Sequence, residues 1–129
     1  KESLRVATNM FKKKAVSLQD LVGKSTSENL IQPEMTLIMD VCNFINDHPH
    51  KIKDGIKYIR NRLKHKNPKV NLLALELLDI CMSNCGQEFQ LKVCNKDFLS
   101  TMAHLCSPRK LDNQTQVEVR DKAVELVNS

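Results

Sequence analysis

The sequence is poor in turn-forming residues and in aromatic side chains. It has no tryptophan, and its 129 residues include 4% aromatics, three glycines and four prolines. Because β-sheet proteins need many turns rich in glycine and proline, this composition favours long helices. No apolar run approaches the ~18 residues that a membrane-spanning helix needs, and no signal peptide is evident. We therefore expect one cytoplasmic helical domain.

Sequence signatures of catalysis and of metal binding are also missing. There is no glycine-rich phosphate loop, and no serine or cysteine has a plausible catalytic base nearby in the sequence. We therefore expect neither an enzyme nor a bound cofactor. The five cysteines lie within apolar helical patterns, and no CxxC or Cys/His pair gives a usual zinc-site spacing. We interpret them as small, reduced core residues: Cys42, Cys81, Cys85, Cys94 and Cys106.

One apolar stretch, from Asn67 to Gly86, organises the predicted fold. Asn67 is a good helix cap before Pro68, and glycine suits the left-handed turn that follows a helix. Apolar side chains cover most of the helical wheel, which indicates a helix buried between neighbours. A narrow polar strip and one apolar residue at its border are left for a partner: Glu76, Asp79, Ser83 and Leu75.

Other segments show helical periodicity and short polar connections. They span residues 17–25, 33–47, 51–65, 87–94, 96–106 and from 115 onward. Capping-box patterns begin two of them, at Ser17 and Thr115. The expected core includes Leu91 and Leu99, and in the last helix Val117, Ala123, Val124 and Val127. We predict an all-α domain over residues 17–129, preceded by a basic extension over residues 1–16, with the helices stacked as a superhelix or irregular bundle.

The positive charge is concentrated in two parts of the chain. The net charge is +5, yet residues 51–69 hold eight lysines and arginines against one acid, Asp54. Within this stretch, four cations share one helix face and form a predicted basic ridge: Lys53, Lys57, Arg60 and Lys64. Lys12, Lys13 and Lys14 end a second basic segment, a candidate amphipathic helix over residues 2–14. A solvated helix face is the plain interpretation, and contact with acidic lipids is the functional one.

Three stretches together resemble a VHS domain, the N-terminal domain of Hrs, STAM, target-of-Myb and GGA proteins. They are KSTSENLIQPEMTLIMDVCNFI (24–45), KIKDGIKYIRNRLKHK (51–66) and NPKVNLLALELLDICMSNCGQEFQLKVCNKDFL (67–99). The resemblance implies a right-handed superhelix of seven to eight helices, here without the eighth. It also implies a non-catalytic adaptor in vesicular protein transport, peripheral on endosomal or trans-Golgi membranes. The related epsin N-terminal and polymerase-tail-binding domains share the superhelix.

The resemblance implies ubiquitin or ubiquitinated cargo as a partner, with a departure in the contact residues. Many family members bind ubiquitin through a tryptophan and an aliphatic residue four positions later, where this chain has Met35 and Met39. Without the aromatic anchor we expect weak binding. Leu75 and Asp79 are the neighbouring residues expected in the contact. A methionine pair at the edge of the core is the plain alternative.

Other partners follow less readily from the sequence. GGA domains bind acidic-dileucine signals through basic and aromatic residues, where this chain has Asn95, Lys96 and Asp97. Because an acid repels an acidic peptide, we do not expect that ligand. A phosphoinositide-binding surface, as in epsin-type domains, is the main alternative function, and a polymerase-tail-binding domain is a third. We expect no nucleic-acid binding, because no aromatic-rich surface supports base stacking, and we expect a monomeric domain.

Overall fold

The computed structural model describes residues 16–129, which form seven α-helices and one short 3-10 turn. The predicted N-terminal helix and its lysines, Lys12 to Lys14, lie outside this range. The described elements are α2 (Leu18–Ser25), α3 (Met35–Asp47), η1 (Pro49–Lys51), α4 (Ile52–Leu63), α5 (Pro68–Asn84), α6 (Gly86–Val93), α7 (Lys96–Cys106) and α8 (Gln114–Val127). These residues contain no strand, as the sequence predicts.

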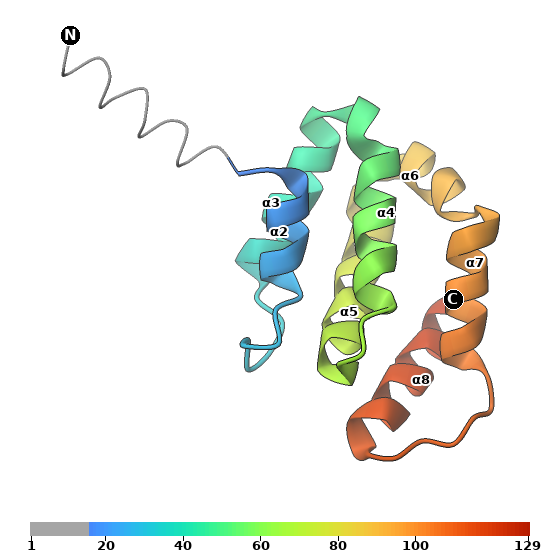
Figure 1. Ribbon diagram of the computed structural model, residues 1–129. Coiled ribbons are helices and arrows are strands. Elements are labelled where there is room, and N and C mark those ends of the chain that lie inside the picture. Colours follow the sequence, from blue (N-terminus) through green and yellow to red (C-terminus); the bar gives the residue numbers. More distant parts are fainter. Residues whose placement is uncertain (1–15) are drawn as a thin grey trace, which may run out of the picture.

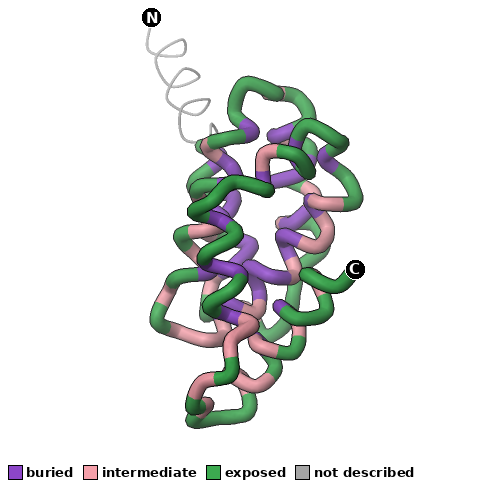
Figure 2. The backbone as a smooth tube through the Cα atoms, turned by 90° about the vertical axis from the view of Figure 1, so that its right-hand side faces the viewer, coloured by how far each residue is buried: buried purple, intermediate pink, exposed green. Residues whose placement is uncertain are grey.

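Helix α5 is the centre of the domain, as its apolar wheel predicts. It contacts α2, α3, α4, α6 and α8. In Figure 1, α2 and α3 stand on one side of the α4–α5 pair, and α7 and α8 stand on the other. Consecutive helices therefore wind into an all-α right-handed superhelix. Buried positions face the inside of this arrangement and exposed positions line its outside, as Figure 2 shows.

Side-chain caps set most of the helix starts that the sequence indicates. Ser17 forms a reciprocal capping box with Asp20, and Asn67 accepts a hydrogen bond from the Lys69 backbone N–H at 2.9 Å. The last helix begins earlier than predicted. Asn113 caps it by accepting from the Gln116 N–H at 2.9 Å, so the predicted capping box at residue 115 is wrong. An asparagine oxygen can satisfy a free N–H of the first turn as well as a hydroxyl does.

A buried asparagine closes the end of α4. The side-chain nitrogen of Asn71, on α5, lies 2.9 Å from the carbonyl oxygens of Arg62, Leu63 and His65. The last carbonyls of a helix have no partner within the helix. Asn71 therefore supplies the missing donor and fixes the sharp α4–α5 connection that brings the two helices side by side.

The predicted core is confirmed along α3, α4 and α5 and is wrong at several edges. Apolar side chains repeat on the inner faces of α3 and α4 and are at most 4% exposed: Ile38, Val41, Cys42, Ile45, Ile52, Ile56, Ile59 and Leu63. Leu91 and Leu99 are 66% and 51% exposed, contrary to the prediction. In α8 the buried residues are Val119 and Ala123, whereas the predicted core residues Val124 and Val127 are exposed. The face of α8 that meets α5 and α7 carries Val119 and Ala123, so the packing of those neighbours decides which apolar residues of α8 are buried.

Candidate functional site

Three cations of α4 line a groove between α4, α6 and α7. Lys53 and Lys57 are exposed, Arg60 is half-buried, and the groove encloses about 610 Å³. The spacing of four and three residues places them on one helix face. Lys64, the fourth residue of the predicted ridge, is exposed but lies at the end of α4, outside the groove lining. The predicted ridge thus becomes one wall of a concave site.

The opposite wall of the groove contains two further lysines that the sequence pattern did not predict. Lys92, from the last turn of α6, and Lys96, at the start of α7, line the groove with Leu91 and Asn95. Asp97 is the one carboxylate in the lining, and Glu88 pairs with Lys92 at 3.4 Å. We define the cations of this site as the basic groove: Lys53, Lys57, Arg60, Lys92 and Lys96.

Arg60 joins the two walls. Its Nε donates to the Asp97 carbonyl oxygen at 3.2 Å and to the Thr101 hydroxyl at 3.1 Å. These bonds tie α4 to the first two turns of α7 and hold the guanidinium at the groove. Among the described residues, Lys53, Lys57, Arg60 and Lys96 form no salt bridge. Positive charge that is not neutralised within the protein can attract an anionic surface.

The residues of the predicted ubiquitin contact lie in different environments. Met35 is 57% exposed at the start of α3, whereas Met39 is half-buried and packs against the core. Leu75 is completely buried, so its predicted contact with a partner is wrong. The wheel of α5 places Leu75 beside the polar strip, but neighbouring helices cover that border too. Met35 therefore remains as the exposed apolar residue of the predicted contact, with Met39 half-buried beside it.

Asp79 faces α8, where Lys122 binds it. The Lys122 ammonium lies 3.1 Å from Asp79 and 3.5 Å from Glu76, and it also reaches Glu125 at 3.8 Å. Burial lowers the pKa of Lys122, but the Asp79 hydrogen bond and the three carboxylates outweigh it, so the pKa is raised. The ion pairs of Glu76 and Asp79 with Lys122 thus hold α8 against α5, and we call these three residues the α8 clamp. Asp79 is therefore already engaged within the domain.

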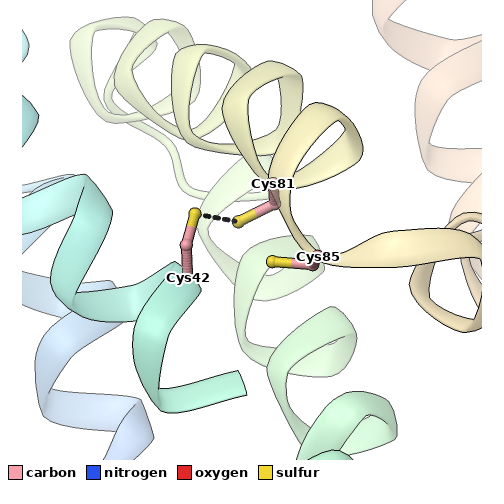
Figure 3. A group of neighbouring side chains, drawn as sticks. All are labelled: Cys42, Cys81 and Cys85. Atoms are coloured by element: carbon pink, nitrogen blue, oxygen red, sulfur yellow. Dashed lines mark hydrogen bonds between the residues drawn. The ribbon is translucent and has the colours of Figure 1, made fainter. Parts of the chain in front are cut away.

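Three of the five cysteines gather in the core between α3 and α5. Cys42 and Cys81 are completely buried, and Cys85 is 7% exposed. Their sulfur atoms all lie within 4.8 Å of one another, and those of Cys42 and Cys81 are 3.7 Å apart. Figure 3 shows the three side chains turned toward one space. The remaining two differ from the prediction, because Cys94 is exposed and Cys106 is half-buried.

The thiols of this cluster do not ionise independently. Donation from the Cys81 thiol, and then from Cys85, lowers the pKa of Cys42. The hydrogen bond between Cys42 and Cys81 raises the pKa of Cys81. The hydrogen bond between Cys42 and Cys85 raises the pKa of Cys85 to about 12. A single thiolate would thus be held by two S–H donors. Away from the cluster, burial raises the pKa of Cys106.

No helix among the described residues has the length and apolar character to cross a bilayer.

Solved structures with the same fold come from one membrane-trafficking protein and from a plant domain. The tandem VHS and FYVE domains of Hrs, a protein involved in membrane trafficking and signal transduction, superpose with a TM-score of 0.75 at 23% identity, covering 88% of this chain and 50% of that one. An ENTH-VHS domain of Arabidopsis thaliana also gives a TM-score of 0.75, at 19% identity, covering 88% and 86%. These similarities establish the fold.

Curated relatives give the family. TOM1-like protein 6 of Arabidopsis thaliana is 34% identical over 108 residues, and the sorting-machinery protein HSE1 of Cryptococcus neoformans is 32% identical over 121 residues. The alignments cover 84% and 93% of this chain but 15% and 18% of those proteins. The chain thus spans less than a quarter of the length of the relatives it matches. The VHS domain model matches residues 12–129, and the chain belongs to the VHS domain family.

Proposed function

We propose that this domain is a non-catalytic adaptor module of vesicular protein sorting and that its basic groove contacts anionic membrane lipids. The groove is the observation that carries the proposal: five cations from three helices face one hollow. The family supports the setting, since an HSE1 protein of the vacuolar sorting machinery and Hrs are among its similar proteins. The corresponding location is the cytoplasmic face of endosomal or trans-Golgi membranes.

The charge of the groove is sufficient for salt-sensitive membrane binding. Each lysine or arginine near an anionic surface contributes about 1 kcal/mol. One of the five has part of its charge offset, because Lys92 pairs with Glu88, whereas the hydrogen bonds of Arg60 go to neutral oxygen atoms and leave its charge in place. Lys53, Lys57 and Lys96, which are exposed and form no salt bridge among the described residues, therefore provide most of the attraction. Their ammonium groups suit the phosphates of a phosphoinositide headgroup, which carry more charge than other lipid headgroups.

Vesicle sedimentation tests this proposal. We expect the domain to sediment with vesicles that contain phosphoinositides and to stay in solution with neutral phosphatidylcholine vesicles. Vesicles with phosphatidylserine at equal total charge show whether the phosphate groups or the net charge are recognised. Binding should weaken steeply between low and physiological salt, because exposed charges are screened. Equal sedimentation with neutral vesicles would contradict the proposal.

The second proposed membrane contact, Lys12 to Lys14, is tested separately. Replacing all three lysines with serine leaves the basic groove unchanged. If the segment contributes, the variant should lose vesicle affinity while retaining the preference for phosphoinositides. An unchanged affinity would assign the contact to the groove alone.

Weak binding of ubiquitin through Met35 is the second candidate function. Its support is the exposure of Met35 (57%) on the outer face of α3, at a position where the family resemblance implies a tryptophan. An NMR titration with ubiquitin should shift amides of residues 35–46. Met35→Trp should strengthen binding, because aromatic anchors carry much of an interface's energy. The matched control is Leu99→Trp, at a similarly exposed apolar residue on α7, which should leave ubiquitin binding unchanged. No shifts on α3 would refute this function.

A further inference from the structure

The cluster of Cys42, Cys81 and Cys85 has the composition of a metal site rather than of ordinary core packing. The surrounding core consists mainly of branched aliphatic and phenylalanine side chains, yet three thiols from α3, α5 and the end of α5 meet at one point within it. Cys42 comes from α3 and Cys81 from α5, and Cys85 is the residue that caps the end of α5, four positions after Cys81. Small core residues need not converge, whereas metal ligands must.

The sulfur spacing fits three bonds to one metal ion. Three sulfurs around a central ion at ~2.3 Å lie about 4.0 Å from one another. The measured spacing is 3.7 Å between Cys42 and Cys81, with all three pairs within 4.8 Å. An ion could therefore be held with sulfur movements of less than about 1 Å, which side-chain rotation alone supplies.

The number of ligands selects the kind of ion. Structural zinc sites are almost always four-coordinate, but this cluster supplies three ligand side chains among the described residues. The fourth position would face an apolar core, where water is disfavoured. Soft thiolate ligands favour Cu(I), which unlike structural zinc does not require a fourth ligand here. We propose that Cys42, Cys81 and Cys85 form a three-coordinate Cu(I) site that links α3 to α5.

Metal binding at this buried site has a consequence for the fold. All three cysteines are buried, and Cys85, which caps the end of α5, is the least buried of them at 7% exposure, so the cluster is nearest to solvent on that side. Each thiol that becomes a thiolate ligand releases one proton to solvent. Because the ligands are 39 residues apart in sequence between α3 and α5, bound Cu(I) stabilises the folded chain against unfolding.

Anaerobic titration of the reduced chain with Cu(I), in competition with a chromogenic Cu(I) chelator, tests the site. We expect one ion per chain, a raised unfolding temperature, and three sulfur neighbours at ~2.3 Å by X-ray absorption. Cys81→Ala should weaken Cu(I) binding at least 100-fold. The matched control, Cys94→Ala with Cys106→Ala, removes two thiols outside the cluster and should leave binding unchanged.

Other results would overturn the site. They are no Cu(I) retained by the unmodified chain, two sulfur neighbours instead of three, or loss of the ion in the control variant. Cys85→Ala provides a second test if Cys81→Ala does not fold, because Cys85 lies at the helix end where truncation disturbs packing least. Retention of full affinity by a folded Cys85→Ala chain would equally overturn the proposal.

Discussion

Replacing Asn71 should destabilise the domain more than any comparable change at its surface. The Asn71 amide is the donor for the Arg62, Leu63 and His65 carbonyls, all at 2.9 Å. It has two N–H groups, so it forms at most two full hydrogen bonds at once. A net hydrogen bond contributes about 1 kcal/mol, and a buried carbonyl left without a donor costs about 1–3 kcal/mol. Asn71→Ala should therefore lower the free energy of unfolding by about 3 kcal/mol.

Chemical denaturation followed by circular dichroism measures this effect. Because a small domain has only about 5–15 kcal/mol of stability, the loss should be obvious in the denaturation midpoint. Asn71→Asp keeps the shape but replaces the donor with an acceptor facing three carbonyls, and it should be at least as damaging. Asn61→Ala makes the same change at an exposed residue of α4 and should stay within about 0.5 kcal/mol. A loss below about 1 kcal/mol for Asn71→Ala would refute the reasoning.

Two further predictions concern the α8 clamp and backbone conformation. Lys122→Met should lower stability by about 1 kcal/mol at pH 7, discounted for partly exposed carboxylates. The folded-state pKa of Lys122 is raised above 10.5, so the stability difference between the two chains should persist below pH 10.5. It should vanish as the pH rises through the folded-state pKa. A stability difference that does not change with pH would contradict this prediction. Gly86 has φ of +82°, so Gly86→Ala should cost about 1 kcal/mol. Gly23 lies inside α2 with open space where an alanine Cβ would stand, so Gly23→Ala should instead stabilise the domain by about 0.7 kcal/mol. Thermal unfolding should show a lower unfolding temperature for Gly86→Ala and a higher one for Gly23→Ala.

The helices could be predicted because local signals decide them. Apolar spacing along α3, α4 and α5 identifies their inner faces, and side chains within one turn cap their starts. The errors occur where a neighbour decides burial. The helical wheel leaves Leu75 at a polar border, but the packing around α5 buries it completely. Leu99 has the spacing of a core residue, yet no neighbouring helix covers it among the described residues.

The candidate sites were predicted only in part, because each joins segments distant in sequence. Local spacing identifies Lys53, Lys57 and Arg60, but Lys92 and Lys96 come about forty residues later. Their approach depends on how α6 and α7 fold back onto α4. The sulfur cluster likewise joins residues 39 positions apart. Neither the second wall of the groove nor the meeting of the thiols has a signal in local periodicity.

The most direct test of the proposed function compares two double variants in the phosphoinositide-vesicle assay. Lys53→Ser with Lys57→Ser removes two charges inside the basic groove. Lys64→Ser with Lys66→Ser removes two exposed charges nearby on the chain but outside the groove. At about 1 kcal/mol per cation, the groove variant should bind roughly 30-fold more weakly, and the control should lose much less. Equal losses, or no loss in the groove variant, would contradict the basic groove as the membrane contact.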